Sequence, residues 1–157
     1  DQIKNDKKIT ITDPNMTRFN ITMNEALDLI MRAIQYKGGG IVLIPKLKSY
    51  RVEDMKNAIT ELLHGKNEVN IIPVRPGEKY HESLISVDEI RNTYETKDDY
   101  IVLQETKEWE SKKFKKTAGI KRSTLKDKYS SDGVQILTKE ELKNILIKEK
   151  LIDKITK

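Results

Sequence analysis

Hydrophobic and polar positions along this chain follow the patterns of alternating strands and helices. Polar and apolar residues alternate over residues 8–12, which predicts a strand, and continuous apolar residues at 41–44 predict a strand buried on both faces. Helical spacing predicts helices over residues 23–36 and 53–64, and residues 69–74 predict another strand. This order of elements is typical of an α/β fold.

Three capping-box sequences predict where helices begin. Thr22, Ser86 and Thr138 are each followed three residues later by a glutamate, so hydroxyl and carboxylate can satisfy the free backbone N–H groups at a helix start. The apolar side of the first helix is expected to lie in the core: Leu27, Ile30, Met31 and Ile34. A strand is predicted over residues 100–104, and residues 105–133 lack apolar periodicity and predict a long loop.

Composition excludes several kinds of site. The 157 residues include no cysteine and two histidines, so disulfides, thiolate zinc sites and a cysteine nucleophile are excluded, and no metal site is expected. No apolar stretch approaches the roughly 20 residues that span a bilayer, and residues 1–8 are polar. We therefore expect a cytoplasmic protein without a membrane segment.

The net charge of +5 leaves open a small basic module that binds nucleic acid or a protein through residues 107–128. Glu108, Glu110 and Asp127 interrupt this basic stretch, and it lacks the interleaved aromatic residues of a single-strand binder. A solvated surface is the favoured interpretation, and no nucleic-acid partner is expected.

Two arginines beside predicted turns are the candidate binding residues. Arg18 and Arg75 each follow a strand or turn, and a guanidinium matches the clustered oxygens of a diphosphate. Glu78 is suited either to accept hydrogen bonds from ribose hydroxyls or to pair with Arg75. His81 and Glu82 allow an acid/base pair or a pair on a helix surface, and without a nucleophile beside them no catalytic residue is predicted.

Three motifs carry a family resemblance: residues 12–19 (TDPNMTRF), 44–46 (IPK) and 75–86 (RPGEKYHESLIS). In this order and spacing they resemble the C-terminal half of the UDP-N-acetylglucosamine 4,6-dehydratases of the extended short-chain dehydrogenase/reductase superfamily. Residues 129–131 and 137–142 are similar to the C-terminal extension of the capsule-biosynthesis (CapD/CapE-like) branch, which includes 5-inverting dehydratases.

The resemblance implies the substrate lobe of a fold whose other half is an NAD(P)-binding Rossmann-type domain. Its boundaries would be residues 1–104 for the lobe and 105–157 for the C-terminal extension. Arginines at the places of Arg18 and Arg75 hold the diphosphate of a UDP-sugar in this superfamily, and an acidic residue at the place of Glu78 binds the ribose. A homo-oligomer is implied for the complete enzyme, and the same lobe also serves UDP-sugar 4-epimerases.

The cofactor-binding features of that family are absent from this sequence. A glycine-rich G-x-x-G-x-x-G fingerprint is missing, and no tyrosine is followed by lysine in the catalytic Tyr-x-x-x-Lys spacing. We therefore expect NAD or NADP to be bound by the absent dinucleotide-binding half, on the same or a separate chain, and this chain to be inactive alone.

Overall fold

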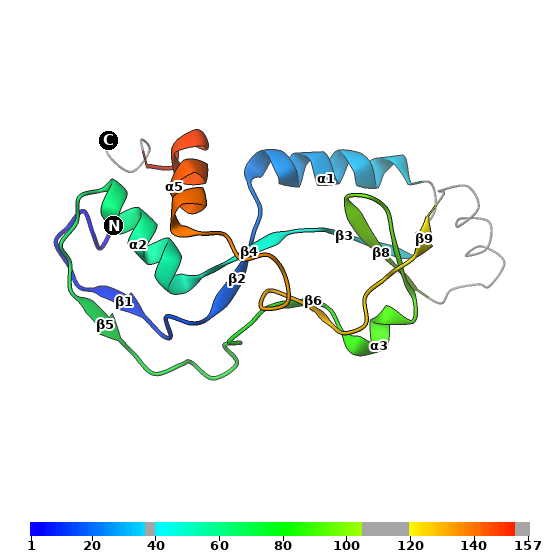
Figure 1. Ribbon diagram of the computed structural model, residues 1–157, viewed down its shortest axis with the longest axis horizontal. Coiled ribbons are helices and arrows are strands. Elements are labelled where there is room, and N and C mark those ends of the chain that lie inside the picture. The colour runs from blue at the N-terminus through cyan, green and yellow to red at the C-terminus, as the bar shows by residue number, and fades with distance from the viewer. Residues whose placement is uncertain (37–39, 105–119, 153–157) are drawn as a thin grey trace. The chain divides into compact units, whose positions relative to one another are not determined.

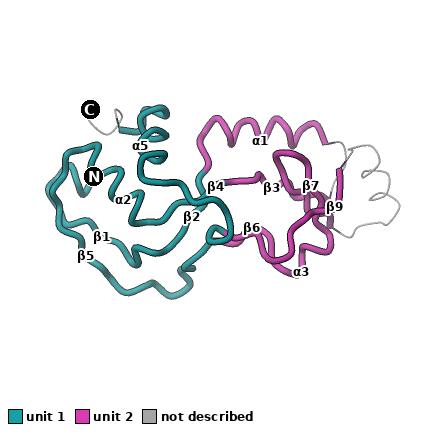
Figure 2. The backbone as a smooth tube through the Cα atoms, in the orientation of Figure 1, with its two compact units in different colours: residues 1–20, 48–82, 131–157 teal, residues 21–47, 83–130 magenta. Residues whose placement is uncertain are grey.

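The computed structural model describes residues 1–36, 40–104 and 120–152 (Figure 1). The chain forms two compact units, coloured separately in Figure 2. Unit 1 consists of residues 1–20, 48–82 and 131–157, and unit 2 of residues 21–47 and 83–130. Each unit is thus assembled from segments that are separated along the chain. The division into residues 1–104 and 105–157, which follows chain order, stays a prediction.

Unit 1 contains two pairs of short strands: β1 (Ile9–Ile11) with β5 (Val69–Ile71), and β2 (Thr17–Asn20) with β4 (Lys48–Arg51). The β1–β5 pair is parallel and the β2–β4 pair is antiparallel, with Arg18 opposite Tyr50. β1 and β5 confirm two predicted strands with shorter bounds. β2 and β4 are not predicted, because their sequences TRFN and KSYR are mostly polar.

Two helices cover the core of unit 1, α2 (Val52–Leu62) and α5 (Lys139–Lys148). The buried cluster between them consists of Ala58, Leu137, Leu142 and Leu146, with Met55, Ile59 and Leu62 packed against it. The capping box at the start of α5 is confirmed, because Thr138 Oγ1 accepts from the Glu141 N–H at 3.2 Å and the Glu141 carboxylate accepts from the Thr138 N–H at 2.9 Å. Burial of each leucine side chain contributes about 1.5–3 kcal/mol.

Unit 2 contains a four-stranded antiparallel sheet in the order β3–β8–β7–β9. Its strands are β3 (Ile41–Pro45), β8 (Asp99–Leu103), β7 (Thr93–Glu95) and β9 (Lys121–Arg122). The prediction that residues 41–44 are buried on both faces is wrong. Only Ile44 of β3 is buried, and Val42 is 44% exposed. A continuous apolar sequence identifies a strand but does not show what covers its two faces.

The first helix, α1 (Met23–Gln35), begins at the predicted Thr22–Glu25 capping box. The prediction that its apolar side lies in the core is wrong, since Leu27, Ile30, Met31 and Ile34 are 52–70% exposed and the helix has no buried residue. Arg32 connects α1 to β8 instead, through two hydrogen bonds of 2.7 and 2.8 Å to the Asp99 carboxylate. Helical periodicity predicts an amphipathic helix but not its packing partner.

The remaining elements of unit 2 are β6 (Ser83–Ile85), α3 (Val87–Ile90) and β10 (Tyr129–Ser130). The predicted capping box of Ser86 and Glu89 starts α3, and β10 pairs antiparallel with β6. The long loop predicted for residues 105–133 thus contains β9 and β10, while residues 105–119 lie outside the described residues. The two units together are a mixed α/β structure, and none of the described helices is long and apolar enough to cross a membrane.

Candidate functional site

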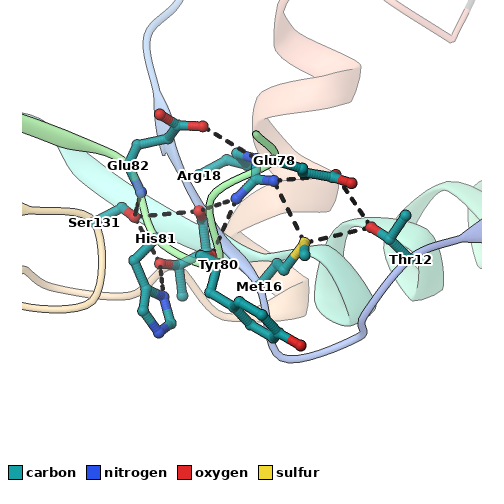
Figure 3. A network of polar contacts seen from close by, with 9 residues as sticks. Thr12, Met16, Arg18, Glu78, Tyr80, His81, Glu82 and Ser131 are labelled. Atoms are coloured by element: carbon teal, nitrogen blue, oxygen red, sulfur yellow. Dashed lines mark hydrogen bonds and ion pairs between the residues drawn. The ribbon is translucent and has the colours of Figure 1, made fainter. Parts of the chain in front are cut away.

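The candidate site lies in unit 1, where β2 meets residues 75–82 (Figure 3). Arg18 extends from β2, and its Nη1 donates to the carbonyl oxygens of Thr17 at 2.8 Å and Tyr80 at 3.1 Å. Since the Thr17 N–H also donates to the Tyr80 carbonyl at 3.0 Å, backbone and side chain bind the same segment. The fold therefore holds the half-buried Arg18 guanidinium in place on one side.

Glu78 brings the two predicted arginine motifs together. Its Oε1 accepts from the Thr12 hydroxyl at 3.1 Å and lies 3.5 Å from Arg18 Nη2, while Oε2 accepts from the backbone N–H of Arg75 at 3.3 Å. The carboxylate thus contacts the motif of residues 12–19 and the turn that begins at Arg75. The ion-pair alternative considered for Glu78 involves Arg18 rather than the side chain of Arg75.

A tight turn over residues 75–78 places Glu78. The Glu78 N–H donates to the Arg75 carbonyl at 3.0 Å, and Gly77 has a φ of +82°. Proline before a glycine with positive φ is the sequence of a type II turn, so Pro76 and Gly77 set this conformation. Arg75 itself is exposed, and its guanidinium makes no hydrogen bond or ion pair with the described part of the chain.

Two carboxylates lie beside Arg18, but neither is tightly bound to it. Nη2 is 3.5 Å from Glu78 Oε1 and Nε is 3.6 Å from Glu82 Oε1. Both distances exceed the ~2.7–2.9 Å of a charge-assisted hydrogen bond. Among the described residues, the other acceptor of Nη2 is a weak one, the Met16 sulfur at 3.4 Å. Nε and Nη2 therefore have capacity for a stronger anionic acceptor.

His81 takes part in a polar network that the sequence does not predict. Its Nδ1 is 2.8 Å from the Thr17 hydroxyl, which is 2.6 Å from the hydroxyl of the fully buried Ser131. The prediction of a helix-surface pair for His81 and Glu82 is wrong, because His81 is extended and forms a bridge with Thr17. Ser131 belongs to residues 129–131, which carry part of the family resemblance, but the sequence does not predict a role for its hydroxyl because that role depends on contacts distant along the chain.

The third predicted motif, residues 44–46, lies in unit 2. Lys46 Nζ is 2.9 Å from a carboxylate oxygen of the buried Glu95, and it lies 4.9 Å from the centre of the Tyr100 ring. Burial acts to raise the pKa of Glu95, but Lys46 and Lys121 outweigh it and lower this pKa overall. In this structure Lys46 therefore neutralises a buried carboxylate of the sheet.

The part of the chain that the structure describes offers no site that fits a metal or a dinucleotide. The described residues contain no group of three or more histidine, cysteine, aspartate or glutamate side chains that could hold a metal ion. Of the described glycines with positive φ, Gly40 directly precedes strand β3 and Gly77 lies in the turn of residues 75–78, so neither stands at a helix start. What the site offers is an arrangement of guanidinium, carboxylate and hydroxyl groups suited to an anionic, hydroxylated ligand.

Comparison with known proteins gives the family. The family described as "Polysaccharide biosynthesis protein" matches residues 1–105. The chain belongs to this family. Over 146 residues the chain is 31% identical to a UDP-glucose 4-epimerase of Rickettsia rickettsii and 32% identical to one of Rickettsia felis, in each case covering 93% of this chain.

The chain is also similar to a solved structure. "X-ray structure of Pen from Bacillus thuringiensis" matches 96% of the chain with a TM-score of 0.80 and 30% identity. Together with the family match it supports an extended short-chain dehydrogenase/reductase fold, as the sequence motifs predict. The chain spans 42% of the length of both Rickettsia proteins and of Pen.

Proposed function

We propose that this chain supplies the UDP-sugar-binding part of an enzyme that modifies UDP-sugars. Arg18 and Arg75 bind the diphosphate, and Glu78 accepts hydrogen bonds from the ribose hydroxyls. The observation that carries the proposal is the position of Glu78, which contacts Arg18 through one oxygen and the backbone of Arg75 through the other. Two arginine motifs that are distant along the chain thus meet around one carboxylate, which is an arrangement suited to adjacent phosphate and ribose groups.

Binding would proceed by exchange of acceptors at Arg18. Phosphate oxygens would replace the loose contacts of Nε and Nη2 with Glu82 and Glu78, while Nη1 keeps its bonds to the backbone carbonyls. The exposed Arg75 would supply a second guanidinium from the turn. Glu78 would then be free to accept hydrogen bonds from the two ribose hydroxyls.

The proposal leaves the redox chemistry to residues outside this chain. NAD or NADP would exchange a hydride with the sugar in the complete enzyme, and the sequence here lacks both the glycine-rich fingerprint and the Tyr-x-x-x-Lys spacing. This chain would bind and orient the nucleotide end of the substrate. Assembly as a homo-oligomer and a cytoplasmic location stay predictions.

Two reactions are candidates for the complete enzyme. The motifs of residues 12–19, 44–46 and 75–86 resemble UDP-N-acetylglucosamine 4,6-dehydratases, and residues 129–131 and 137–142 are similar to the branch that includes the 5-inverting ones. The names of the Rickettsia relatives, UDP-glucose 4-epimerase, favour a 4-epimerase. Incubation of UDP-N-acetylglucosamine and UDP-glucose with this chain, a supplied cofactor-binding half and NAD or NADP separates them by mass spectrometry. A dehydratase product has lost one water, whereas an epimerase product keeps the mass of its substrate and is identified by its changed retention in chromatography before the mass spectrometer.

Calorimetric titration of UDP-N-acetylglucosamine into the 157-residue chain tests the binding proposal. Arg18→Ala and Arg75→Ala are each expected to weaken binding by about 1.5–3 kcal/mol, the value of a hydrogen bond to a charged group. Arg91→Ala is the matched control, since Arg91 is exposed, lies in unit 2 and makes no ion pair with the described residues. Equal loss in all three variants would show a net-charge effect and contradict the proposal.

The same titration addresses the alternative of a basic nucleic-acid-binding module. Such a module would bind duplex or single-stranded nucleic acid with an affinity that falls steeply as the salt concentration rises. Titration with a UDP-sugar would then release no heat of binding. A nucleic-acid-binding function does not explain the contacts among Arg18, Glu78 and the backbone of residues 75–78. Nucleic acid binding without UDP-sugar binding would favour the module over the substrate lobe.

A further inference from the structure

Ser131 is a buried hydroxyl with an unusual number of polar contacts. Its side chain is fully inaccessible, and its Oγ lies 2.6 Å from Thr17 Oγ1, 3.1 Å from the Thr17 carbonyl oxygen and 2.9 Å from the Glu82 backbone nitrogen. Figure 3 shows Ser131 beside Glu82 and His81. Within unit 1, the Ser131 side chain therefore joins β2 to residues 80–82.

The number of available protons determines which groups donate and which accept in this network. The Thr17 carbonyl can only accept, so Ser131 donates its single proton there, and its Oγ accepts from the Glu82 N–H. The Thr17 hydroxyl then donates to Ser131 Oγ, and it must accept from His81 Nδ1. If Ser131 donated to the Thr17 hydroxyl instead, it would have no proton left to donate to the Thr17 carbonyl. The network thus favours the His81 tautomer that carries its proton on Nδ1.

Two of the residues that Ser131 contacts, Thr17 and Glu82, also lie beside Arg18. The Thr17 carbonyl accepts from both Ser131 Oγ and Arg18 Nη1. Glu82, whose backbone N–H is fixed by Ser131, lies 3.6 Å from Arg18 Nε through its carboxylate. A change at Ser131 is therefore transmitted to two different groups in contact with the Arg18 guanidinium.

We propose that Ser131 is a positioning residue for the diphosphate-binding Arg18, acting through a proton-ordered network of Thr17, His81 and the Glu82 backbone. This inference rests on the proposed function of the site. Ser131 does not contact the ligand; it fixes the carbonyl that orients the guanidinium. Preordering an arginine in this way reduces the conformational entropy that binding would otherwise cost.

The matched control is Ser49→Ala. Ser49 is also fully buried and lies in unit 1, but its hydroxyl has no hydrogen-bond partner among the described residues. UDP is titrated into the wild-type, Ser131→Ala and Ser49→Ala chains. We expect Ser131→Ala to weaken UDP binding by about tenfold and Ser49→Ala by less than about twofold. Ser131→Cys, which keeps a side chain of similar size but hydrogen-bonds weakly, is a second variant with the same expected loss.

Nitrogen NMR of the His81 ring supplies a readout that a purely structural role would not change. The spectra are recorded without ligand at about pH 8, where histidine side chains are generally neutral, and His64→Gln assigns the signals of the two histidines. The wild-type chain is expected to carry the proton on Nδ1. In Ser131→Ala the Thr17 hydroxyl loses its acceptor and turns to Nδ1, so the proton is expected on Nε2.

The outcomes separate the two proposals. UDP affinity in Ser131→Ala and Ser131→Cys equal to that of Ser49→Ala would overturn the positioning role and leave the proposed function standing. A wild-type chain that does not bind UDP would overturn both the proposed function and the positioning role. The ligand-free spectra decide the proton order in either case, since Nε2–H in the wild type or Nδ1–H in Ser131→Ala contradicts it.

Discussion

Arg18 and Arg75 differ in how far the fold fixes their side chains. Arg18 is half-buried and bound by two backbone carbonyls, whereas Arg75 is exposed on a turn and its guanidinium makes no hydrogen bond or ion pair with the described residues. Ordering a free arginine costs up to about 2 kcal/mol in side-chain entropy, and Arg18 has already lost much of that freedom. Arg18 therefore acts as the preformed half of the proposed diphosphate site, and the ligand itself would order Arg75.

Gly77 controls the turn that places Glu78. Its φ of +82° is disfavoured for residues with a Cβ, and a Cβ built there meets no atom within 4 Å. Gly77→Ala is therefore expected to destabilise the chain by about 1 kcal/mol through backbone strain alone, and to weaken UDP binding by moving Glu78. Urea unfolding and UDP titration measure the two effects.

Gly77→Asn is the control for this prediction, because asparagine tolerates positive φ better than alanine does. It is expected to retain most of the stability and of the UDP affinity. If alanine and asparagine had equal effects, the loss would not arise from the backbone conformation, and the account of the turn would be contradicted.

At the scale of elements, α2 and α5 are joined by an ion-pair cluster on their surface. Lys139 Nζ lies 2.7 Å and Lys143 Nζ 2.5 Å from the Glu61 carboxylate. Hydrogen bonds from Lys139 and Lys143 lower the pKa of Glu61 to about 2 from an ordinary 4.5. A carboxylate with a depressed pKa stabilises the fold above its ordinary pKa, and this contribution is lost as the pH falls through the folded value.

The pH dependence of the melting temperature follows from this shift. Wild type is expected to melt above Glu61→Gln at pH 7, and the difference is expected to shrink between about pH 4.5 and 2. Added salt is expected to reduce this difference in melting temperature at neutral pH, since the charges are solvent-exposed. Glu149→Gln at the end of α5 removes one charge without breaking an ion pair of the described residues. A Glu61→Gln difference that did not change with pH would contradict the ion-pair explanation.

The two isoleucines Ile34 and Ile101 provide a matched test of the packing in unit 2. Ile34 on α1 is 70% exposed, whereas Ile101 at the centre of β8 is fully buried. Ile101→Ala is expected to lower the free energy of unfolding by about 2–5 kcal/mol, and Ile34→Ala to change it by less than about 0.5 kcal/mol. Urea unfolding of both variants measures this. Similar losses would show that the apolar side of α1 is packed within the chain.

Features set by local sequence could be predicted from the sequence. The capping boxes at Thr22, Ser86 and Thr138 start helices as expected, because each depends on residues three positions apart. The burial of α1 and of residues 41–44 was predicted wrongly, because an apolar pattern does not specify what packs against it.

Features that depend on distant contacts could not be predicted. The strands β2 and β4 are short and polar, and they form because they pair with each other. In the site, residue type and neighbouring turns indicated Arg18, Arg75 and Glu78 as candidates. Thr17 and Ser131 lie in segments that carry the resemblance, but the role of their hydroxyls was not predicted, because a buried hydroxyl is recognised only once its partners are placed.

For the molecule as a whole, the central proposed property is affinity for a nucleoside diphosphate. This affinity requires both arginine motifs. Residues 12–19 and 75–82 belong to the same compact unit, so their contacts around Glu78 do not depend on how the units are arranged. A chain that spans 42% of its relatives' length can therefore be tested for binding without the chemistry of the complete enzyme.

The most direct measurement compares UDP with UMP by calorimetry, in the wild-type chain and in the Arg18→Ala/Arg75→Ala double variant. The account predicts that wild type prefers UDP by at least about tenfold, since the second phosphate adds charge-assisted hydrogen bonds, and that the double variant binds both ligands with equal, weaker affinity. A preference for UDP that persisted in the double variant would show that other residues bind the diphosphate, and it would contradict the account.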